Sequence, residues 1–253
     1  MSQALHSGRW AWLTALAFYG VWTAATWLLE GRTLVLLRPE AVGERIVYVV
    51  IANLLIGTFA ALWLHTKLQG DASAQTPRRR ALALGGGFLA GAGLYVAQGA
   101  PTLDPIVVLN GFLQVLPVST AEVLVCWLVL GSQIQVRIAR FGPRWGNMAG
   151  ALVSSVAFGL YHIAHSPPFD SWGMIALLTG VGLLTSLFYA LSRDIFGAIV
   201  FHNFLALYGV LQALIAAGHE ATFETLQWPL LFMAIVSLMV LTIGMCFFRR
   251  RVA

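Results

Sequence analysis

Eight apolar runs, each close to the length needed to cross a bilayer, are the feature that most limits how this chain can fold. A helix needs about 20 apolar residues to span the hydrocarbon core of a membrane. The runs are Trp10–Leu29, Ile46–His65, Ala81–Gly99, Ile106–Ile134, Met148–Ala164, Trp172–Leu191, Ile195–Ala217 and Leu226–Phe248. Only 10% of the 253 residues are charged, whereas soluble domains carry about 25%. We therefore expect an all-α, polytopic membrane helix bundle with about eight transmembrane helices.

The basic residues predict the orientation of this bundle. Lys and Arg are enriched in cytoplasmic loops. With a cytoplasmic N-terminus, twelve of the fifteen basic residues fall in cytoplasmic segments, and only Arg32, Arg38 and Arg45 fall outside. This alternation predicts that both termini are cytoplasmic. Because the basic residues are scattered in short clusters and form no single face, the sequence does not favour a nucleic-acid partner.

The same runs suggest one integral-membrane domain over residues 1–253. The fourth run contains Pro117 and is long for a straight span, so it is expected to kink there or to begin as a short re-entrant segment. The third run is rich in glycine, which permits close helix packing. These glycines are Gly85, Gly86, Gly87, Gly91 and Gly93.

Three ionisable residues lie within the apolar runs. Glu122 is in the fourth, His162 near the end of the fifth, and His202 about two helical turns into the seventh. The other nine acidic residues lie at the ends of runs or in loops. Ionisable groups inside a membrane are expensive, so each is a candidate functional residue. His165 follows His162 by three residues and is expected at the membrane interface.

Glutamate and two histidines on three spans suit hydrolysis. A carboxylate and an imidazole can take a proton from water, while a second imidazole can stabilise an oxyanion. Glu122, His162 and His202 could also hold a divalent metal such as zinc, although no His-Glu-x-x-His motif is present. Each residue could instead be structural. Ideal straight helices place His202 about 10 Å from the cytoplasmic side and His162 much nearer the outside, so a shared site requires tilted or kinked spans.

These segments resemble the CPBP family of intramembrane proteases, which includes the type II CAAX prenyl proteases and bacterial abortive-infection proteins. The likeness covers about residues 117–208. The family shows Glu-Glu-x-x-x-Arg, then Phe-x-x-x-His, then His-x-x-x-Asn, each on a membrane helix. Phe158 and His162 complete the second motif, and His202 leads the third. The resemblance implies that glutamate and the first histidine activate water, and that the last histidine and asparagine stabilise the oxyanion.

The sequence departs from the family at three motif positions. Ala121 stands where the first glutamate is expected, so Glu122 matches the second. Cys126 replaces the arginine, and Ala206 replaces the asparagine, although Asn203 lies next to His202. The first motif is therefore degenerate, and Asn203 is the candidate supporting residue for an oxyanion.

The resemblance implies a membrane-embedded endopeptidase in which Glu122, His162 and His202 are catalytic, supported by Asn203. The alternative is a catalytically impaired relative that acts as a membrane binding or scaffold protein. A transporter, or a haem protein with His162 and His202 as axial ligands, forms a third class. The expected partners are the lipid bilayer and a peptide or membrane-protein substrate, which the resemblance allows to be prenylated. It also implies the inner (plasma) membrane of a bacterium, and leaves open whether a metal cofactor is used.

Overall fold

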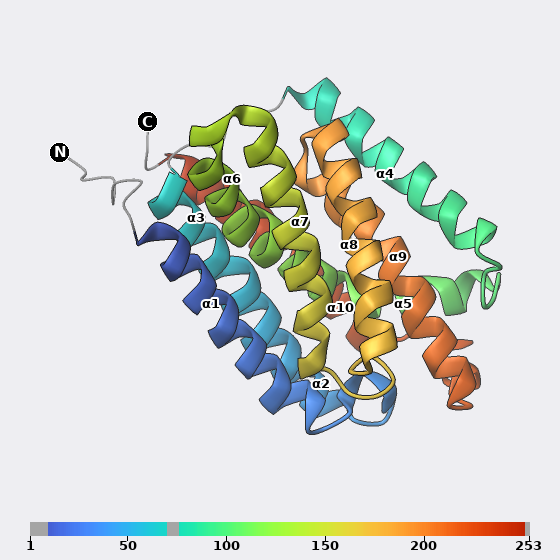
Figure 1. The fold of residues 1–253 in the computed structure, drawn as a ribbon. Helices are drawn as coiled ribbons and strands as arrows, with labels where there is room; N and C mark the ends of the chain where they lie inside the picture. Colours follow the sequence, from blue (N-terminus) through green and yellow to red (C-terminus); the bar gives the residue numbers. More distant parts are fainter. Residues whose placement is uncertain (1–9, 70–75, 251–253) are drawn as a thin grey trace.

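The computed structural model describes residues 10–69 and 76–250, and over these residues the fold is a bundle of helices (Figure 1). Within these described residues, eight helices are long and apolar enough to cross a membrane. They are Ala11–Gly31, Val42–Leu68, Pro77–Ala97, Pro105–Phe141, Pro143–Ala164, Trp172–Ser192, Ile195–Ala216 and Trp228–Phe247. Each overlaps one predicted run. The all-α, multi-pass integral-membrane architecture is therefore confirmed.

Several of these helices consist of consecutive α-helical, 3₁₀ and π-helical elements. The first part of the chain forms α1 (Ala11–Thr26), η1 (Trp27–Gly31), η2 (Val35–Leu37), α2 (Val42–Tyr48), η3 (Val49–Ala60), α3 (Ala61–Gln69) and α4 (Pro77–Ala97). The middle forms α5 (Pro105–Glu122), η4 (Val123–Gly131), α6 (Ser132–Ile138), η5 (Ala139–Phe141), α7 (Pro143–Tyr161) and η6 (His162–Ala164). The last part forms α8 (Trp172–Ser192), α9 (Ile195–Ala216), η7 (Glu220–Phe223) and α10 (Trp228–Arg250).

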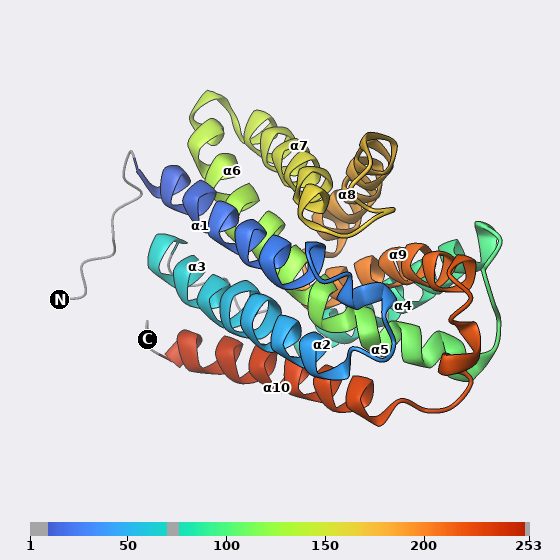
Figure 2. The same ribbon diagram turned by 90° about the horizontal axis from the view of Figure 1, so that it is seen from below.

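The fourth long helix, formed by α5, η4 and α6, runs through the middle of the bundle (Figure 2). Its most apolar stretch is completely buried, as expected for a helix that is hydrophobic on all sides. Helices α1, α3, α7, α9 and α10 pack around it, while α4 packs against α9 and α8 packs against α7 and α9. Residues on this axis therefore face helices from both halves of the chain.

Pro117 does not interrupt the central helix. Asp104 caps its first turn by accepting hydrogen bonds from the N–H groups of Ile106 and Val107, and α5 continues through Pro117 to Glu122. The hydrogen-bonding pattern changes only at Val123, where the π-helical η4 begins. The expected re-entrant start is therefore wrong. The irregularity lies directly after Glu122, in a helix type that often marks functional sites.

Only two of the five glycines of α4 serve the expected close packing. A Cβ on Gly87 would meet the backbone carbonyl of Gly197 in α9, and one on Gly91 would meet the ring of Phe204. Gly85, Gly86 and Gly93 have no neighbouring atom within 4 Å of such a Cβ, so the prediction is wrong for them.

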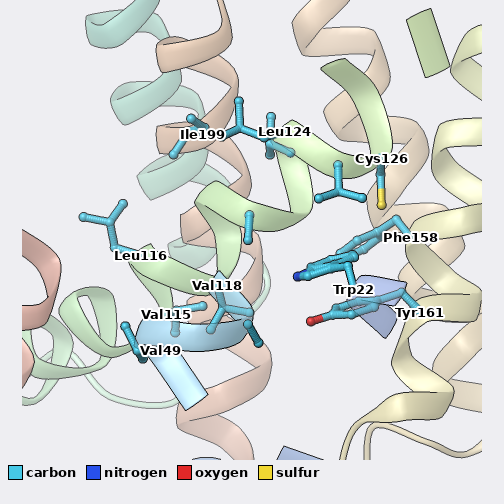
Figure 3. Close-up of a cluster of buried hydrophobic side chains, with 14 of the residues drawn as sticks. Trp22, Val49, Val115, Leu116, Val118, Leu124, Cys126, Phe158, Tyr161 and Ile199 are labelled. Carbon is cyan, nitrogen blue, oxygen red and sulfur yellow. The ribbon is translucent and has the colours of Figure 1, made fainter. Parts of the chain in front are cut away.

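An aromatic stack fixes α1 against α7. The rings of Trp22 and Tyr161 lie parallel with centroids 3.8 Å apart, within the buried cluster of Figure 3. The hydroxyl groups of Thr26 and Tyr161 lie 2.9 Å apart and share a hydrogen bond. One turn further on, Gly31 comes so close to the carbonyl of Ala164 that a Cβ would not fit. The end of the first span is thereby held beside the end of the fifth.

The cytoplasmic placement of both termini stays a prediction. Residues 1–9 and 251–253 lie outside the described residues. The single-domain organisation over residues 1–253 also stays a prediction.

Candidate functional site

Glu122 occupies the last α-helical position of α5, near the middle of the central helix. Its side chain is buried, with 2% of the residue exposed. One carboxylate oxygen faces His202 and the other faces His162. The three ionisable residues that the sequence singled out therefore meet, although they come from α5, η6 and α9. The difference in depth expected for straight spans therefore does not keep them apart.

His202 is held between Glu122 and Thr185. Its Nε2 lies 3.1 Å from Oε2 of Glu122, and its Nδ1 lies 2.8 Å from the hydroxyl of Thr185 in α8. The carboxylate of Glu122 can only accept, so Nε2 carries the proton of this hydrogen bond. The hydroxyl of Thr185 also donates to the carbonyl of Val181 at 3.1 Å, so its contact with Nδ1 does not by itself set the proton position on the ring. With both ring nitrogens occupied, His202 has none left to act as the axial ligand of a haem. Its ring is fully buried.

His162 presents a free nitrogen to the same carboxylate. Its Nδ1 lies 2.9 Å from the backbone carbonyl of Phe158, which can only accept, so Nδ1 carries the proton. The Nε2 of the neutral ring then has a lone pair and lies 3.7 Å from Oε1 of Glu122. The ring of Phe158 packs edge-on against both His162 and His202. The Phe-x-x-x-His motif thus orients two histidines.

The structure adds a carboxylate and a histidine that the sequence reasoning did not select. Glu30, in η1, is completely buried, and its Oε2 lies 3.0 Å from Nδ1 of His165. Ser166 donates to Glu30 through its backbone N–H at 3.0 Å and its hydroxyl at 2.6 Å. The rings of His165 and His162 stack with centroids 5.0 Å apart. His165 is therefore part of the buried cluster.

A cavity of about 490 Å³ reaches this cluster. Glu122, His162 and His165 line it, together with Phe158 and mostly apolar side chains of α4, α5, α8 and α9. Two of those side chains, Leu177 and Leu184, are also exposed on the outer surface of α8. The cavity therefore joins polar groups at its inner end to an apolar wall that continues onto the lateral face of the bundle.

The three departing motif positions and Asn203 lie in different surroundings. Ala121 is completely buried and faces Gly57 of η3, away from the cavity. Cys126 is buried and lies near Phe158 and Trp22 in Figure 3. Ala206 lines the cavity wall. Asn203 is buried, and its amide donates to the carbonyl of Phe112 at 3.1 Å.

One group of ligand atoms in the described part of the chain is compact enough to hold a metal ion. Glu122, His162 and His165 each offer an atom within 4.8 Å of the others. This set differs from the one expected from the sequence because His165 takes the place of His202. One carboxylate and two imidazoles are donors that zinc accepts in proteins.

Fold and site together define a multi-pass integral membrane protein with a buried glutamate–histidine cluster at the end of an apolar cavity. Residues 132–208 match the family model of the Rce1-like proteins, described as type II CAAX prenyl endopeptidase Rce1-like. The chain therefore carries an Rce1-like domain of the CPBP family over these residues, and this is a family of peptidases. No curated protein and no solved structure matches the chain.

The match includes part of the site. His162, His165 and His202 lie inside residues 132–208, and Glu122 and Glu30 precede them. The family assignment therefore rests on the helices that carry the histidines. The expected core from residue 117 extends 15 residues further toward the N-terminus than the match.

Proposed function

We propose that this protein is a membrane-embedded endopeptidase of the type II CAAX prenyl protease kind, which hydrolyses a peptide bond with water activated by Glu122 and His162. One observation carries the proposal: Oε1 of Glu122 and Nε2 of His162 lie 3.7 Å apart on the wall of the cavity. Both atoms accept hydrogen bonds and neither can donate to the other, so a water molecule that donates to them would satisfy both.

Hydrolysis would follow from that arrangement. The water oxygen attacks the carbonyl carbon of the substrate while its proton moves to Glu122 or His162. The C–N bond then breaks, and the same proton passes to the nitrogen of the leaving amine. General base catalysis of this kind contributes roughly 10²–10⁴-fold to rate. Glu122 and His162 are thus the proposed catalytic residues.

His202 takes a different part in this proposal from the one the resemblance implied. Its Nε2–H is directed at Glu122, so it supports that carboxylate, and we assign it as a positioning residue. Asn203 as an oxyanion donor stays a prediction, and its amide already has a backbone partner. Because position 206, on the cavity wall, holds alanine where the resemblance expects asparagine, it offers no amide to stabilise an oxyanion. Low intrinsic activity is therefore expected.

The cavity favours an apolar substrate segment. Its wall consists mainly of leucine, valine and alanine side chains and continues onto the exposed surface of α8. Burial of apolar surface contributes about 25 cal/mol per Å², so a prenyl group or an apolar stretch of a membrane protein would bind there. We place this reaction in the inner membrane of a bacterium, as the resemblance to bacterial relatives implies.

Activity on farnesylated and unmodified peptides tests the proposal. The purified protein in detergent should release a fragment from the farnesylated peptide, and Glu122→Gln and His162→Ala should each lower kcat by at least roughly 10²-fold. His219→Ala, outside the membrane spans, is the matched control and should retain full activity. Equal activity of wild type and Glu122→Gln would exclude the mechanism.

Ala121 and Ala206 favour a second candidate, a binding or scaffold protein that has lost catalysis. Two positions that carry functional side chains in the family motifs hold only methyl groups here. In that case Glu122→Ala and His162→Ala would fold and keep the cellular phenotype of the gene. Loss of the phenotype in both variants at normal protein levels would exclude it.

A further inference from the structure

We propose that the cavity is entered from the non-cytoplasmic side of the membrane, and that its substrate is an apolar segment of a secreted or membrane polypeptide presented on that side. The inference rests on the proposed function for the reaction itself, but the side of entry is measured without a peptidase assay. It selects one of the two apolar groups considered above, the polypeptide segment rather than a prenyl group on a cytoplasmic C-terminus.

The open end of the cavity lies at one end of the bundle. Gln98 at the end of α4, and Gln212 and Ala216 in the last turns of α9, line the cavity there and are exposed. Figure 1 shows the end of α9 and the start of α4 at opposite ends of the bundle. From Ala216 the wall follows α9 back to Leu205, about 16 Å at the rise of an α-helix. Glu122 lies at the inner end of this wall.

The opening also extends sideways, along α8. This helix packs against α7, while α9 packs against α4. A short turn, Arg193–Asp194, joins α8 to α9 at the other end of the bundle and holds the two helices together there. Leu177 and Leu184 of α8 line the cavity and are also exposed on the outer surface. An apolar segment can therefore enter from the bilayer as well as from the end of the bundle.

The opposite end of the bundle is closed by close helix contacts. A Cβ on Gly197, in the first turn of α9, would meet the backbone carbonyl of Ala83 in α4. A Cβ on Gly146, in the first turn of α7, would meet the backbone carbonyl of Gln135 in α6. Small residues let helix backbones in a membrane approach this closely. These helix pairs leave no entry to the cavity from that end.

A hydrogen-bonded layer separates the inner end of the cavity from this closed end. Trp127 follows Glu122 on the central helix by five residues and is buried. Its Nε1 donates to the hydroxyl of Ser186 in α8 at 2.8 Å, and that hydroxyl lies 3.0 Å from the hydroxyl of Ser155 in α7. The Trp127 ring also packs against the ring of His202. Three helices are thereby joined across the layer.

The basic residues predict which end faces the cytoplasm. Lys and Arg are enriched on the cytoplasmic side of membrane proteins. Most of those in the described part of the chain lie at the closed end: Lys67, Arg78, Arg79, Arg80, Arg137, Arg140, Arg144 and Arg193. At the open end they are Arg32, Arg38 and Arg45. The open end of the cavity is therefore the non-cytoplasmic one.

The depth of the cavity defines the substrate further. An extended chain rises about 3.3 Å per residue, so the apolar wall of about 16 Å along α9 corresponds to about five substrate residues between the open end and the scissile bond. A polypeptide that has crossed the membrane, or the non-cytoplasmic end of a transmembrane segment, supplies such a stretch. A C-terminus that stays in the cytoplasm meets only the closed end.

Thiol labelling from one side of the membrane tests the route. The exposed Cys246 is replaced by serine, and the buried Cys126 is kept. Gln212→Cys places a thiol at the open end, and Arg144→Cys places one at the closed end; both positions are exposed. A membrane-impermeant maleimide should label Gln212→Cys in spheroplasts and Arg144→Cys only in inside-out vesicles.

A thiol on the cavity wall reports entry itself. Ala206 is half-buried and lines the cavity, so Ala206→Cys should react with a small charged methanethiosulfonate added to spheroplasts and not with the same reagent added to inside-out vesicles. An unmodified peptide of six leucines and alanines with a charged tail cannot cross the membrane. In excess, it should slow this labelling at least several-fold in spheroplasts, and wild-type protein should cleave it there.

The route and the reaction fail separately. Labelling of Ala206→Cys from outside, with protection by the unmodified peptide, supports the route even if no peptide is cleaved; that absence of cleavage counts against the proposed function alone. Labelling of Ala206→Cys only in inside-out vesicles overturns the route even if the purified protein is an active peptidase. An Ala206→Cys thiol that reacts on neither side, but reacts after denaturation, also overturns it.

Discussion

The methyl group of Ala121 packs directly against the backbone of Gly57, so that a Cβ at Gly57 would overlap it. Ala121 is completely buried in this contact. The resemblance to the CPBP proteases places the first glutamate of their motif at this position, one residue before Glu122. The close approach of η3 to the central helix leaves no room for a longer side chain here.

Restoring this glutamate should therefore damage the fold. Ala121→Glu must place a longer, charged side chain against Gly57, and overpacking alone costs about 1–3 kcal/mol. We expect a lower thermal midpoint in detergent and a smaller monodisperse fraction. Ala206→Glu makes the same chemical change on the cavity wall and should fold. Equal stability of the two variants would show that η3 can move away.

Restoring the asparagine at position 206 should have the opposite result. Ala206 lines the cavity, so Ala206→Asn has space and adds an amide donor near the proposed reaction. An oxyanion donor contributes roughly 10²–10³-fold, and kcat for the farnesylated peptide should rise toward that range with little change in KM. A folded variant with unchanged kcat would show that residue 206 does not reach the scissile carbonyl.

The hydroxyl of Thr185 should affect catalysis through His202. Thr185→Val removes the hydroxyl 2.8 Å from Nδ1 of His202 and with it a hydrogen bond that holds the ring toward Glu122. We expect kcat to fall by roughly 10–100-fold, a range typical of residues that orient a functional group, with KM nearly unchanged. Thr185→Ser keeps the hydroxyl and should restore activity. A defect of equal size in both variants would indicate a packing role.

Two adjacent glycines of α4 provide a test of the helix packing. Gly87→Ala places a methyl group against the carbonyl of Gly197, and we expect a loss of about 1–3 kcal/mol in stability. Gly86→Ala points into open space and should be neutral or stabilising, because alanine favours a helix by about 1 kcal/mol over glycine. Thermal unfolding in detergent measures both. Similar midpoints for the two variants would contradict the tight contact between α4 and α9.

The architecture could be read from the sequence because a bilayer allows few alternatives. A run of about 20 apolar residues has to become a helix to satisfy its backbone hydrogen bonds, so the number and order of the spans followed from hydropathy. Pro117 did not predict where the central helix becomes irregular. Its helix has neighbours on all sides, and its hydrogen-bonding pattern changes six residues later, at Val123.

The site could be predicted only in part. Glu122, His162 and His202 were found because ionisable residues are rare inside apolar runs. Glu30 was passed over because it lies at the end of a run, where acids are common. The order of the spans could have indicated Glu30. The first and fifth spans cross the membrane in the same direction, so Glu30 and His165, at their ends, are expected on the same side of the membrane.

The role of His202 required coordinates. Its Nδ1 contacts the hydroxyl of Thr185, 17 residues away in α8, and no motif records that contact. The pairing of His162 with His165 depended similarly on the change from an α-helix to a 3₁₀ turn after Tyr161.

The family match at residues 132–208 covers only part of the candidate site. That segment contains the three imidazoles, while both carboxylates come from helices that precede it. Transplanting the matched segment alone would transfer the histidines without Glu122, the proposed catalytic carboxylate, and without Glu30, which contacts His165. The histidines of this chain therefore represent only part of its buried polar cluster, because Glu30 comes from the first span and Glu122 from the central helix.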